Sequence, residues 1–177
     1  MKILFLDSIS KEYSASVKKL LLQCDKDFVP CLSSRSGVYQ KNLSSKHFSL
    51  LPRSKRIDPY FNELCNQSVI LAVKDGVVVG LLAYRLGYAS DIVPIGKNIY
   101  VTTVVVSKDF RKRGFSRAMF ESLIYKYPAL DIYIRTWSTN KGQISLLSKL
   151  LFKKHVAIPN DRGNGVDTIY FCRKGWV

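Results

Sequence analysis

The sequence is poor in the residues that bind metals and form disulfides. Only 4 of its 177 residues are cysteines and 2 are histidines. The cysteines form no CxxC pair, and both histidines lie far from them in the sequence. Structural zinc sites use closely spaced ligands of these types. We therefore expect no metal site, and four reduced thiols in an intracellular compartment.

Long apolar runs are also absent. The N-terminal segment MKILFLDSIS has an apolar run, Ile3 to Leu6, that ends at Asp7. A signal peptide has an apolar region of about 7–15 residues, and a transmembrane helix needs about 20. We therefore predict a cytoplasmic protein with no membrane partner. No repeat or linker divides the chain, so residues 1–177 are expected to form a single domain.

Acidic residues are scarce. The sequence has 13 Asp and Glu residues and 28 Lys and Arg residues, which gives a formal net charge of +15. Such an excess favours an anionic partner, which could be nucleic acid, a membrane surface, a phosphorylated ligand or an acidic substrate. The charge does not choose among them. No recognisable nucleic-acid motif is present, so nucleic acid is not our expected partner.

Apolar periodicity predicts a regular series of elements. Strands are expected at 2–6, on both sides of Asp75-Gly76 within 68–85, at 99–106, 131–137, 155–159 and 166–174. Helices are expected at 10–23, 58–67, from the turn after 107 to about Tyr127, and at 141–152, where Ile144, Leu147, Leu150 and Leu151 form an apolar stripe. The segment 31–56 has no clean period and is predicted to be a long loop with at most one short helix.

Two local signals refine this series. Asp75-Gly76 is typical of a two-residue hairpin turn, and Gly80 inside the next strand indicates a bulge or a close approach of another group to the backbone. The predicted class is α/β (α+β), with a mixed, mostly antiparallel central sheet of six to seven strands and helices on both faces. The predicted order is β-α-α-β-β-β-α-β-α-β-β.

Four cations crowd the start of the helix that follows residues 99–106: Arg111, Lys112, Arg113 and Arg117. A helix N-terminus is partially positive, so each cation there is unfavourable by a few tenths to about 1 kcal/mol. An anion bound to the free N–H groups of that terminus would explain them, with Gly114 allowing close approach. A basic, solvent-facing turn explains the same residues. Neither a Walker A loop nor a GxGxxG pattern is present.

The segment around Gly114 resembles a cofactor motif. Arg111-x-x-Gly114-x-Ser116 is similar to the [RQ]-x-x-G-x-[GA] acetyl-coenzyme A (acetyl-CoA) motif of the GNAT N-acetyltransferase superfamily, which also follows a strand and opens a helix. The stretches VKDGVVVG, TWSTN and LSKLLFKKH resemble other parts of that family. The resemblance covers residues 68–173, and it implies acetyl-CoA as the co-substrate and no metal.

The resemblance also implies a set of cofactor contacts. The backbone of Val104, Val105 and Val106 would pair with the pantetheine arm. The amides of Lys112, Arg113, Gly114, Phe115 and Ser116 would hold the pyrophosphate, beside the cations Arg111 and Arg117. Asn140 would contact the pantetheine or hold the strands apart. Valines are equally expected in a core, and Asn140 equally suits a helix N-cap.

The sequence departs from the family pattern at three positions. Ser116 replaces the usual Gly or Ala, and Leu151 replaces the usual Gly before Phe152. Leu147 stands where many members have a Tyr that protonates the departing thiolate. Strand 99–106 has no carboxylate, and Asp91 before it is expected to face solvent. No general acid or base is therefore assigned.

The function predicted on this basis is N-acyl transfer from acetyl-CoA to a primary amine, by direct attack in a ternary complex. An inactive coenzyme A-binding domain and a basic RNA- or ribosome-binding protein are the alternatives. The resemblance places the acceptor, a small molecule or a protein, against residues 31–60 and 87–98. The first of these segments is basic, so we expect an acceptor with a carboxylate or phosphate near its amine.

Overall fold

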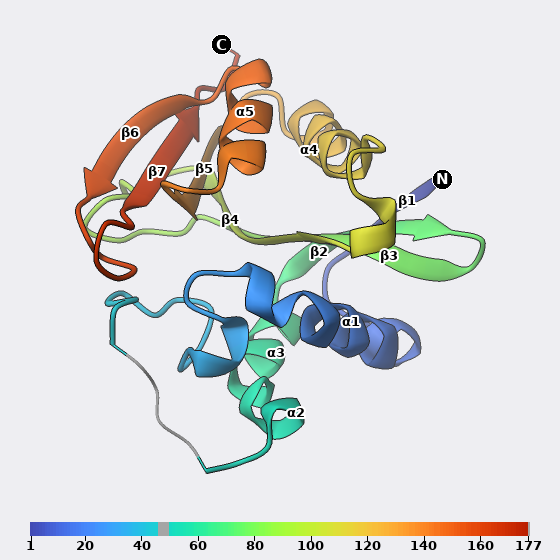
Figure 1. Ribbon diagram of the computed structural model, residues 1–177. Coiled ribbons are helices and arrows are strands. Elements are labelled where there is room, and N and C mark those ends of the chain that lie inside the picture. Colours follow the sequence, from blue (N-terminus) through green and yellow to red (C-terminus); the bar gives the residue numbers. More distant parts are fainter. Residues whose placement is uncertain (46–49, 177) are drawn as a thin grey trace.

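One sheet of seven strands forms the centre of the molecule (Figure 1). The computed structural model describes residues 1–45 and 50–176. The strands are β1 (Lys2–Leu6), β2 (Ser68–Lys74), β3 (Val77–Leu86), β4 (Asn98–Val106), β5 (Asp131–Trp137), β6 (Lys153–Ile158) and β7 (Thr168–Arg173). Their spatial order is β1-β2-β3-β4-β5-β7-β6, and every neighbouring pair is antiparallel except β4 and β5. The predicted mixed, mostly antiparallel sheet is confirmed.

Helices cover both faces of the sheet. The helices α1 (Lys11–Cys24), α2 (Arg53–Arg56) and α3 (Asp58–Cys65) lie on one face, and α4 (Phe115–Lys126) and α5 (Lys141–Lys149) lie on the other (Figure 1). Short 3-10 helices occupy Asp25–Asp27, Leu32–Ser34 and Lys108–Phe110. The predicted order is confirmed, and the short helix expected within 31–56 is α2, which lies at the end of that segment. None of the helices in the described ranges is long and apolar enough to cross a membrane.

The hairpin between β2 and β3 follows its local sequence. Asp75 and Gly76 have φ angles of 50° and 78°, as a tight primed turn requires. Gly80 pairs with Ala72 while the next pair is Val73 with Val78, so β3 carries a bulge beside Gly80. A Cβ at Gly80 would also lie 3.2 Å from Cε of Met119. The bulge and the close approach predicted for this glycine are both present.

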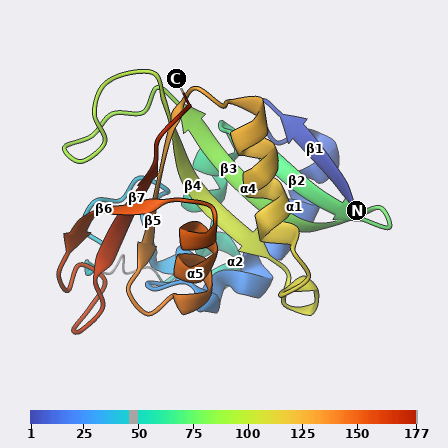
Figure 2. The same ribbon diagram turned by 90° about the horizontal axis from the view of Figure 1, so that it is seen from above.

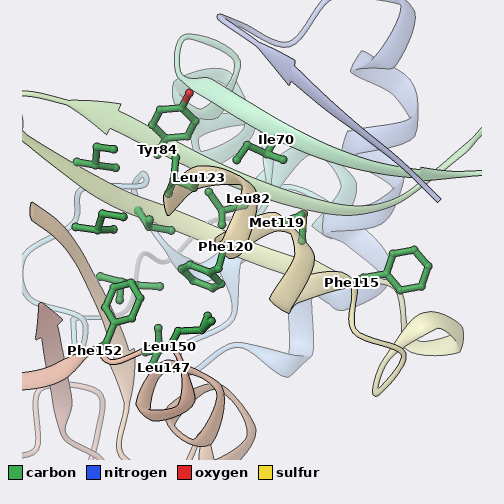
Figure 3. Packing of buried hydrophobic residues seen from close by; sticks show 14 of the residues in the cluster. Ile70, Leu82, Tyr84, Phe115, Met119, Phe120, Leu123, Leu147, Leu150 and Phe152 are labelled. Atoms are coloured by element: carbon green, nitrogen blue, oxygen red, sulfur yellow. The ribbon is translucent and has the colours of Figure 1, made fainter. Parts of the chain in front are cut away.

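Strand β3 divides the core between the two faces. Leu82 faces α4, where it joins the cluster of Met119 and Phe120 (Figure 3). Leu81 and Ala83 belong instead to the cluster on the side of α1 and α3. Because successive side chains of a strand point to opposite faces, the apolar residues of this strand hold helices on both sides of the sheet.

Strand β4 leaves its neighbour β5 halfway along its length. The last parallel pair is Val101 with Ile134. The next residue, Thr102, is an extra residue relative to β3, because Ala83 pairs with Thr103 and Tyr84 pairs with Val101. A bulge bends a strand and increases its twist. From residue 102 onward the edge of β4 that faces β5 is therefore open, and Figure 2 shows the two strands diverging.

The end of α5 differs from the prediction. The helix ends at Lys149 and not at 152, and Leu151 adopts a left-handed φ of 65°. The N–H of Phe152 bonds to the carbonyl of Leu147 at 3.0 Å, which closes the helix in a Schellman-type turn. Leu151 is 64% exposed and therefore not part of the apolar stripe. The left-handed conformation at this position explains why glycine suits it.

Candidate active site

The open edge of β4 faces β5 across a cavity of about 450 Å³, which we call the large cavity. It is lined by Asp27, Phe28, Val104, Val105, Val106, Phe110, Arg111, Lys112, Gly114, Phe115, Ser116, Arg117, Trp137, Asn140, Gly142, Gln143 and Leu146. All the predicted cofactor residues except Arg113 are brought together here. Val105 and Val106 are also buried in the two main cores, as the alternative interpretation of the valines expected.

A row of free backbone donors lies at the start of α4. Within the described part of the chain, the N–H groups of residues 112–117 have no hydrogen-bond acceptor. Lys112 and Gly114 have φ angles of 57° and 84°, and Gly114 is the N-cap of the helix. A Cβ at Gly114 would meet nothing within 4 Å, so the space beside the turn is open. Consecutive amides that converge at a helix N-terminus form an anion-binding concavity.

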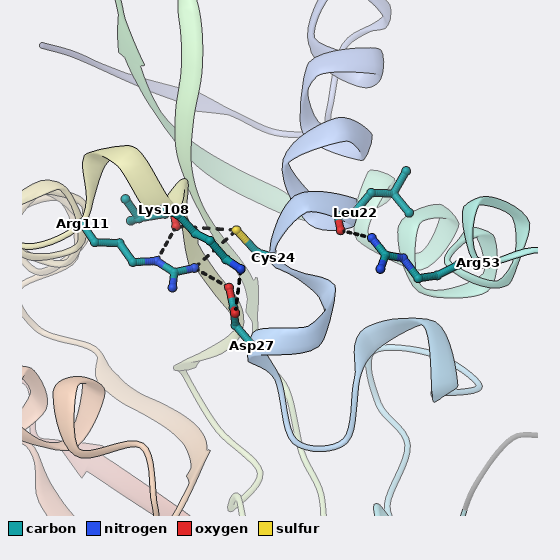
Figure 4. A network of polar contacts seen from close by, with 7 residues as sticks. Leu22, Cys24, Asp27, Arg53, Lys108 and Arg111 are labelled. Carbon is teal, nitrogen blue, oxygen red and sulfur yellow. Dashed lines mark hydrogen bonds and ion pairs between the residues drawn. The ribbon is translucent and has the colours of Figure 1, made fainter.

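The cation Arg111 is engaged within the protein. Its guanidinium bonds to the carboxylate of Asp27 at 2.6 Å and to the carbonyl of Val106 at 3.0 Å, and Lys108 lies 3.3 Å from the same carboxylate (Figure 4). Burial favours the neutral form of Asp27, but the hydrogen bond and charge of Arg111 outweigh it and hold the pKa of Asp27 below its ordinary value. This pair ties the end of α1 to the loop after β4.

The other cations of the turn differ in their surroundings. Arg117 pairs with Glu121 one helical turn later, at 2.8 Å, and the guanidinium carbon of Arg113 lies 5.5 Å from the ring centre of Phe110. Acidic partners thus neutralise Arg111 and Arg117. The N–H donors that remain available to an anion are those of the backbone and of the side chains of Lys112 and Arg113, which form no ion pair with a described carboxylate.

Asn140 and Gln143 connect β5 to α5 at the wall of the cavity. Oδ1 of Asn140 accepts a bond from the backbone N–H of Gln143 at 3.4 Å, and its Nδ2 donates to the hydroxyl of Thr136 at 3.1 Å. Asn140 is therefore the N-cap of α5 and also lines the cavity. The buried Nε2 of Gln143 has no acceptor among the described residues. Sequence reasoning missed Gln143, because a single glutamine in a helix carries no pattern.

Leu147, which stands where many GNAT members have a general acid, does not face the large cavity. Leu147 is fully buried in the core between α4, α5 and the sheet (Figure 3). The residues of α5 that line the cavity are Gly142, Gln143 and Leu146. Asp91 is exposed and paired with Lys41 at 3.0 Å, which confirms that it faces solvent.

A second cavity of about 50 Å³, which we call the small cavity, lies on the same gap. It is lined by Phe28, Arg35, Thr102, Thr103, Val104, Ile134, Arg135, Thr136, Trp137, Asn140, Gln143 and Arg162. No carboxylate or histidine is among these residues. Segment 31–60 contributes Arg35, although its residues 46–49 lie outside the described part of the chain. Among the described lining residues, none comes from 87–98.

Three arginines of the small cavity lie close enough to influence one another. Arg35 and Arg162 are 5% and 7% exposed, and Arg135 is half-buried. Burial, followed by the charges of Arg35 and Arg135, lowers the pKa of Arg162 to about 9. A guanidinium normally titrates above 12. The electrostatic potential in this cavity is therefore strongly positive.

The cysteines and the possible metal ligands form no further candidate site in the described residues. All four cysteines are free thiols. Within 1–45 and 50–176, no three His, Cys, Asp or Glu side chains gather as a metal site would require. The absence of a metal site and the cytoplasmic location stay predictions.

The sequence profile of the acetyltransferase (GNAT) family matches residues 37–151. No curated protein sequence matches the chain.

Solved structures share the fold at low sequence identity. The smu.2055 protein of Streptococcus mutans UA159 has a TM-score of 0.67 at 17% identity, covering 98% of this chain and 99% of that one. The ribosomal-protein-S18-alanine N-acetyltransferase of Escherichia coli has a TM-score of 0.64 at 12% identity, with 99% and 96% covered. The yncA protein of Salmonella typhimurium, solved with its cofactor acetyl-CoA, has a TM-score of 0.61 at 15% identity, with 98% and 94% covered. The profile match spans more than half of the sequence, and on that ground the chain belongs to the GNAT family of acetyltransferases.

Proposed function

We propose that the protein transfers the acetyl group of acetyl-CoA to a primary amine while both substrates are bound. The observation that carries this proposal is the row of free amides at 112–117, at one end of the open edge of β4. Family membership supports it, as do a structural neighbour solved with acetyl-CoA and another named for acetylating an alanine of a ribosomal protein.

The residues around the large cavity fit the proposed co-substrate. The amides of 112–117 suit a pyrophosphate, because they are unpaired donors at the positive end of a helix. The open edge of β4 at Val104–Val106 suits an extended arm that contains amides, which would add to the sheet like a strand. When bound, acetyl-CoA supplies a thioester whose carbonyl carbon is open to attack by an amine.

The residues that would meet the amine include no base. The amine must lose its proton before it attacks, and none of the described residues that line the small cavity is a carboxylate or a histidine. Nearby positive charge disfavours the protonated form of an amine. The guanidiniums of Arg35, Arg135 and Arg162 would therefore favour a neutral acceptor, with the proton released to water on binding. Holding the two reactants side by side supplies the remaining acceleration.

Cofactor binding is tested by thermal unfolding. A ligand that binds only the folded state at a hundredfold excess over Kd stabilises it by about 2.7 kcal/mol, which raises Tm by several degrees for a domain of this size. Acetyl-CoA, coenzyme A and dephospho-coenzyme A should all raise Tm, whereas adenosine should not, because it lacks the anion. Unchanged unfolding with every coenzyme A form would contradict the proposal, and salt-dependent retention on RNA would then be the next measurement.

Catalysis is tested by release of free coenzyme A, followed with a thiol reagent across a panel of amines. We expect turnover with at least one amine. The second candidate function is a coenzyme A-binding domain without activity, and it is favoured by the lack of a base at the small cavity and by the buried position of Leu147. A Tm shift without turnover of any amine would select that function.

A further inference from the structure

Three guanidiniums from distant parts of the chain meet at the small cavity. Arg35 follows the 3-10 helix Leu32–Ser34, Arg135 lies on β5, and Arg162 lies between β6 and β7. Arg35 and Arg162 are almost completely buried. Charged side chains are rarely buried to this extent unless an opposite charge or several hydrogen bonds compensate them.

Each guanidinium uses only part of its donor capacity. Nε and Nη2 of Arg35 donate to the carbonyl of Pro30 at 3.1 and 2.9 Å. Nη2 of Arg135 donates to the carbonyl of Val38 at 3.1 Å. Nε and Nη1 of Arg162 donate to the hydroxyl of Thr168 at 3.0 Å and to the carbonyl of Val29 at 2.6 Å. These bonds hold the loop 29–38 against the cavity.

Further donors have no acceptor in the part of the chain that the structure describes. They are Nη1 of Arg35 and Nη2 of Arg162, whereas Arg135 also has a side-chain hydrogen bond with Tyr170. A guanidinium carries five N–H donors in a planar fork that matches the oxygens of a carboxylate or phosphate. The donor set is therefore larger than the protein's own acceptors satisfy.

None of the three arginines forms an ion pair with a described carboxylate. Asp25 and Asp161 are acids whose charges reach the cluster. The carboxylate of Asp25 accepts hydrogen bonds from the backbone N–H and the hydroxyl of Ser33, and it lies 3.6 Å from Nε of Arg53. Asp161 accepts the hydroxyl of Thr168. The cluster thus holds positive charge that the protein leaves without a counterion.

We propose that the small cavity binds an oxyanion of the acceptor, a carboxylate or a phosphate, so that the substrate is an anionic amine. This inference rests on the proposed acetyl transfer. The two cavities share five lining residues, Phe28, Val104, Trp137, Asn140 and Gln143. An oxyanion held by the arginines would place an amine a few bonds away at this junction, facing the open edge of β4. Polyamines would be repelled by the same charges.

Pairs of amines that differ in their anionic group test the proposal. The initial rate of acetylation of each amine is measured with saturating acetyl-CoA. Suitable pairs are glycine against glycinamide, and phosphoethanolamine against ethanolamine, with spermidine as a polycation. The first pair tests the carboxylate and the second the phosphate. We expect kcat/KM to be at least about tenfold higher for the anionic member of one pair. Equal or better rates with the neutral amines, or with spermidine, would overturn the proposal.

Variants then assign the preference to the cluster. Arg135→Gln removes the least buried of the three charges, and Arg173→Gln removes a buried arginine of β7 that lines neither cavity. Arg135→Gln should lower kcat/KM for the anionic amine about tenfold more than for its neutral counterpart, and leave Kd for acetyl-CoA unchanged. Arg173→Gln should keep the preference. If the arginines only fasten the loop, Arg135→Gln will lower Tm without changing the ratio of the two rates, and the proposal fails.

A binding measurement separates this inference from acetyl transfer itself. Acetate and inorganic phosphate are added to the ligand-free protein, and Tm is recorded for the wild type, Arg135→Gln and Arg173→Gln. We expect one of the two ions at millimolar concentration to raise Tm in the wild type and in Arg173→Gln, and to lose most of that effect in Arg135→Gln. No shift with either ion, or an equal shift in all three proteins, would overturn the inference even if acetyl-CoA binds and turnover is observed.

Discussion

The large and small cavities both present positive charge to the gap between β4 and β5, but they do so with different groups. In the large cavity most of the free donors are backbone amides at 112–117, beside the side chain of Lys112, and Asp27 and Glu121 neutralise two of the surrounding cations. In the small cavity the donors are the side chains of three arginines, two of them buried, which form no ion pair with a described carboxylate. A site made of amides tolerates any substitution that preserves the turn, whereas a site made of side chains changes its ligand with one substitution. The proposed cofactor site is therefore robust and the proposed acceptor site adjustable.

The largest effect is expected from a change that blocks the amides themselves. Gly114→Val places a branched side chain in the open space beside the turn. We expect Kd for coenzyme A, measured by calorimetry, to rise about 100-fold, because two or more charge-assisted hydrogen bonds are lost. The fold should be retained, at a cost of about 1–2 kcal/mol for a side chain at a left-handed position.

Gly76→Val is the matched control for that variant. Gly76 has a similar φ of 78°, and a Cβ there also meets nothing within 4 Å, but it lies in the β2–β3 turn, outside both cavities. It should lose similar stability and keep its affinity for coenzyme A. Unchanged affinity in Gly114→Val would remove the amides from the cofactor site.

A smaller effect is expected from the exposed cations of the large cavity. Arg111→Gln should raise Kd for coenzyme A by about tenfold or less at low salt, since the side chain is 40% exposed and already paired with Asp27. The difference from wild type should shrink as salt rises, because exposed charges are screened. The effect of Arg135→Gln on the anionic amine should depend less on salt, since the neighbouring charges of Arg35 and Arg162 are buried. Equal salt dependence of the two effects would contradict the contrast between the cavities.

Gln143 lies where the cavities meet, and its unpaired donor should reduce stability. Gln143→Met keeps the shape and helix propensity of the side chain. We expect the ligand-free protein to gain about 1 kcal/mol in free energy of unfolding, because a buried donor without an acceptor is removed. The KM of the amine or the Kd of acetyl-CoA should rise a few-fold if a ligand accepts that donor.

Gln67→Met is the control for this effect. Gln67 is buried too, but its oxygen accepts the hydroxyl of Thr102 and its Nε2 donates to the carbonyl of Glu63. Because both of its polar groups are satisfied, the substitution should destabilise the protein in urea unfolding. A loss of stability in Gln143→Met would mean that Gln143 has a partner.

The smallest effect is expected from Asp27→Asn. Loss of this negative charge should lower Kd for coenzyme A about threefold and reduce stability at pH 7 by less than about 1 kcal/mol. The folded pKa of Asp27 lies below its ordinary value of 3.8, so the ionised group stabilises the protein above that pH. The stability difference from wild type should therefore disappear as pH falls below 3.8. A difference that persists at lower pH would show that the carboxylate charge is not its cause.

The sequence was informative wherever local chemistry decides the structure. Asp75-Gly76 predicted the hairpin, since its turn needs residues that tolerate positive φ. Gly114 marked the start of α4, because few other residues adopt a left-handed N-cap. The end of α5 was misplaced because an apolar residue, Leu151, occupies a left-handed position that normally selects glycine. Its neighbours Leu150 and Phe152 are buried, which made the helical stripe look longer than it is.

The small cavity could not be predicted in the same way. Arg35, Arg135 and Arg162 lie about a hundred residues and then a few tens of residues apart, and they meet only because β5 pairs with β7 and the loop 29–38 folds beneath them. The expectation of an anionic acceptor came from the basic character of 31–60, but no local pattern identified Arg135 or Arg162. Asp27 was missed as well, because its role depends on α1 ending beside the loop that carries Arg111.

Because of the bulge at Thr102, the gap between β4 and β5 depends on the number of residues in β4 as well as on its side chains. Strand β4 has one residue more than β3 requires, and its pairing with β5 ends just before that residue. Deleting Thr102 would remove this extra residue and leave the pairs of Val101 with Tyr84 and of Thr103 with Ala83 in place, so that the bend and added twist of β4 would be lost. Insertions and deletions at this one codon, more than point substitutions around it, would decide whether the two halves of the sheet open into a transferase site or close into an uninterrupted sheet.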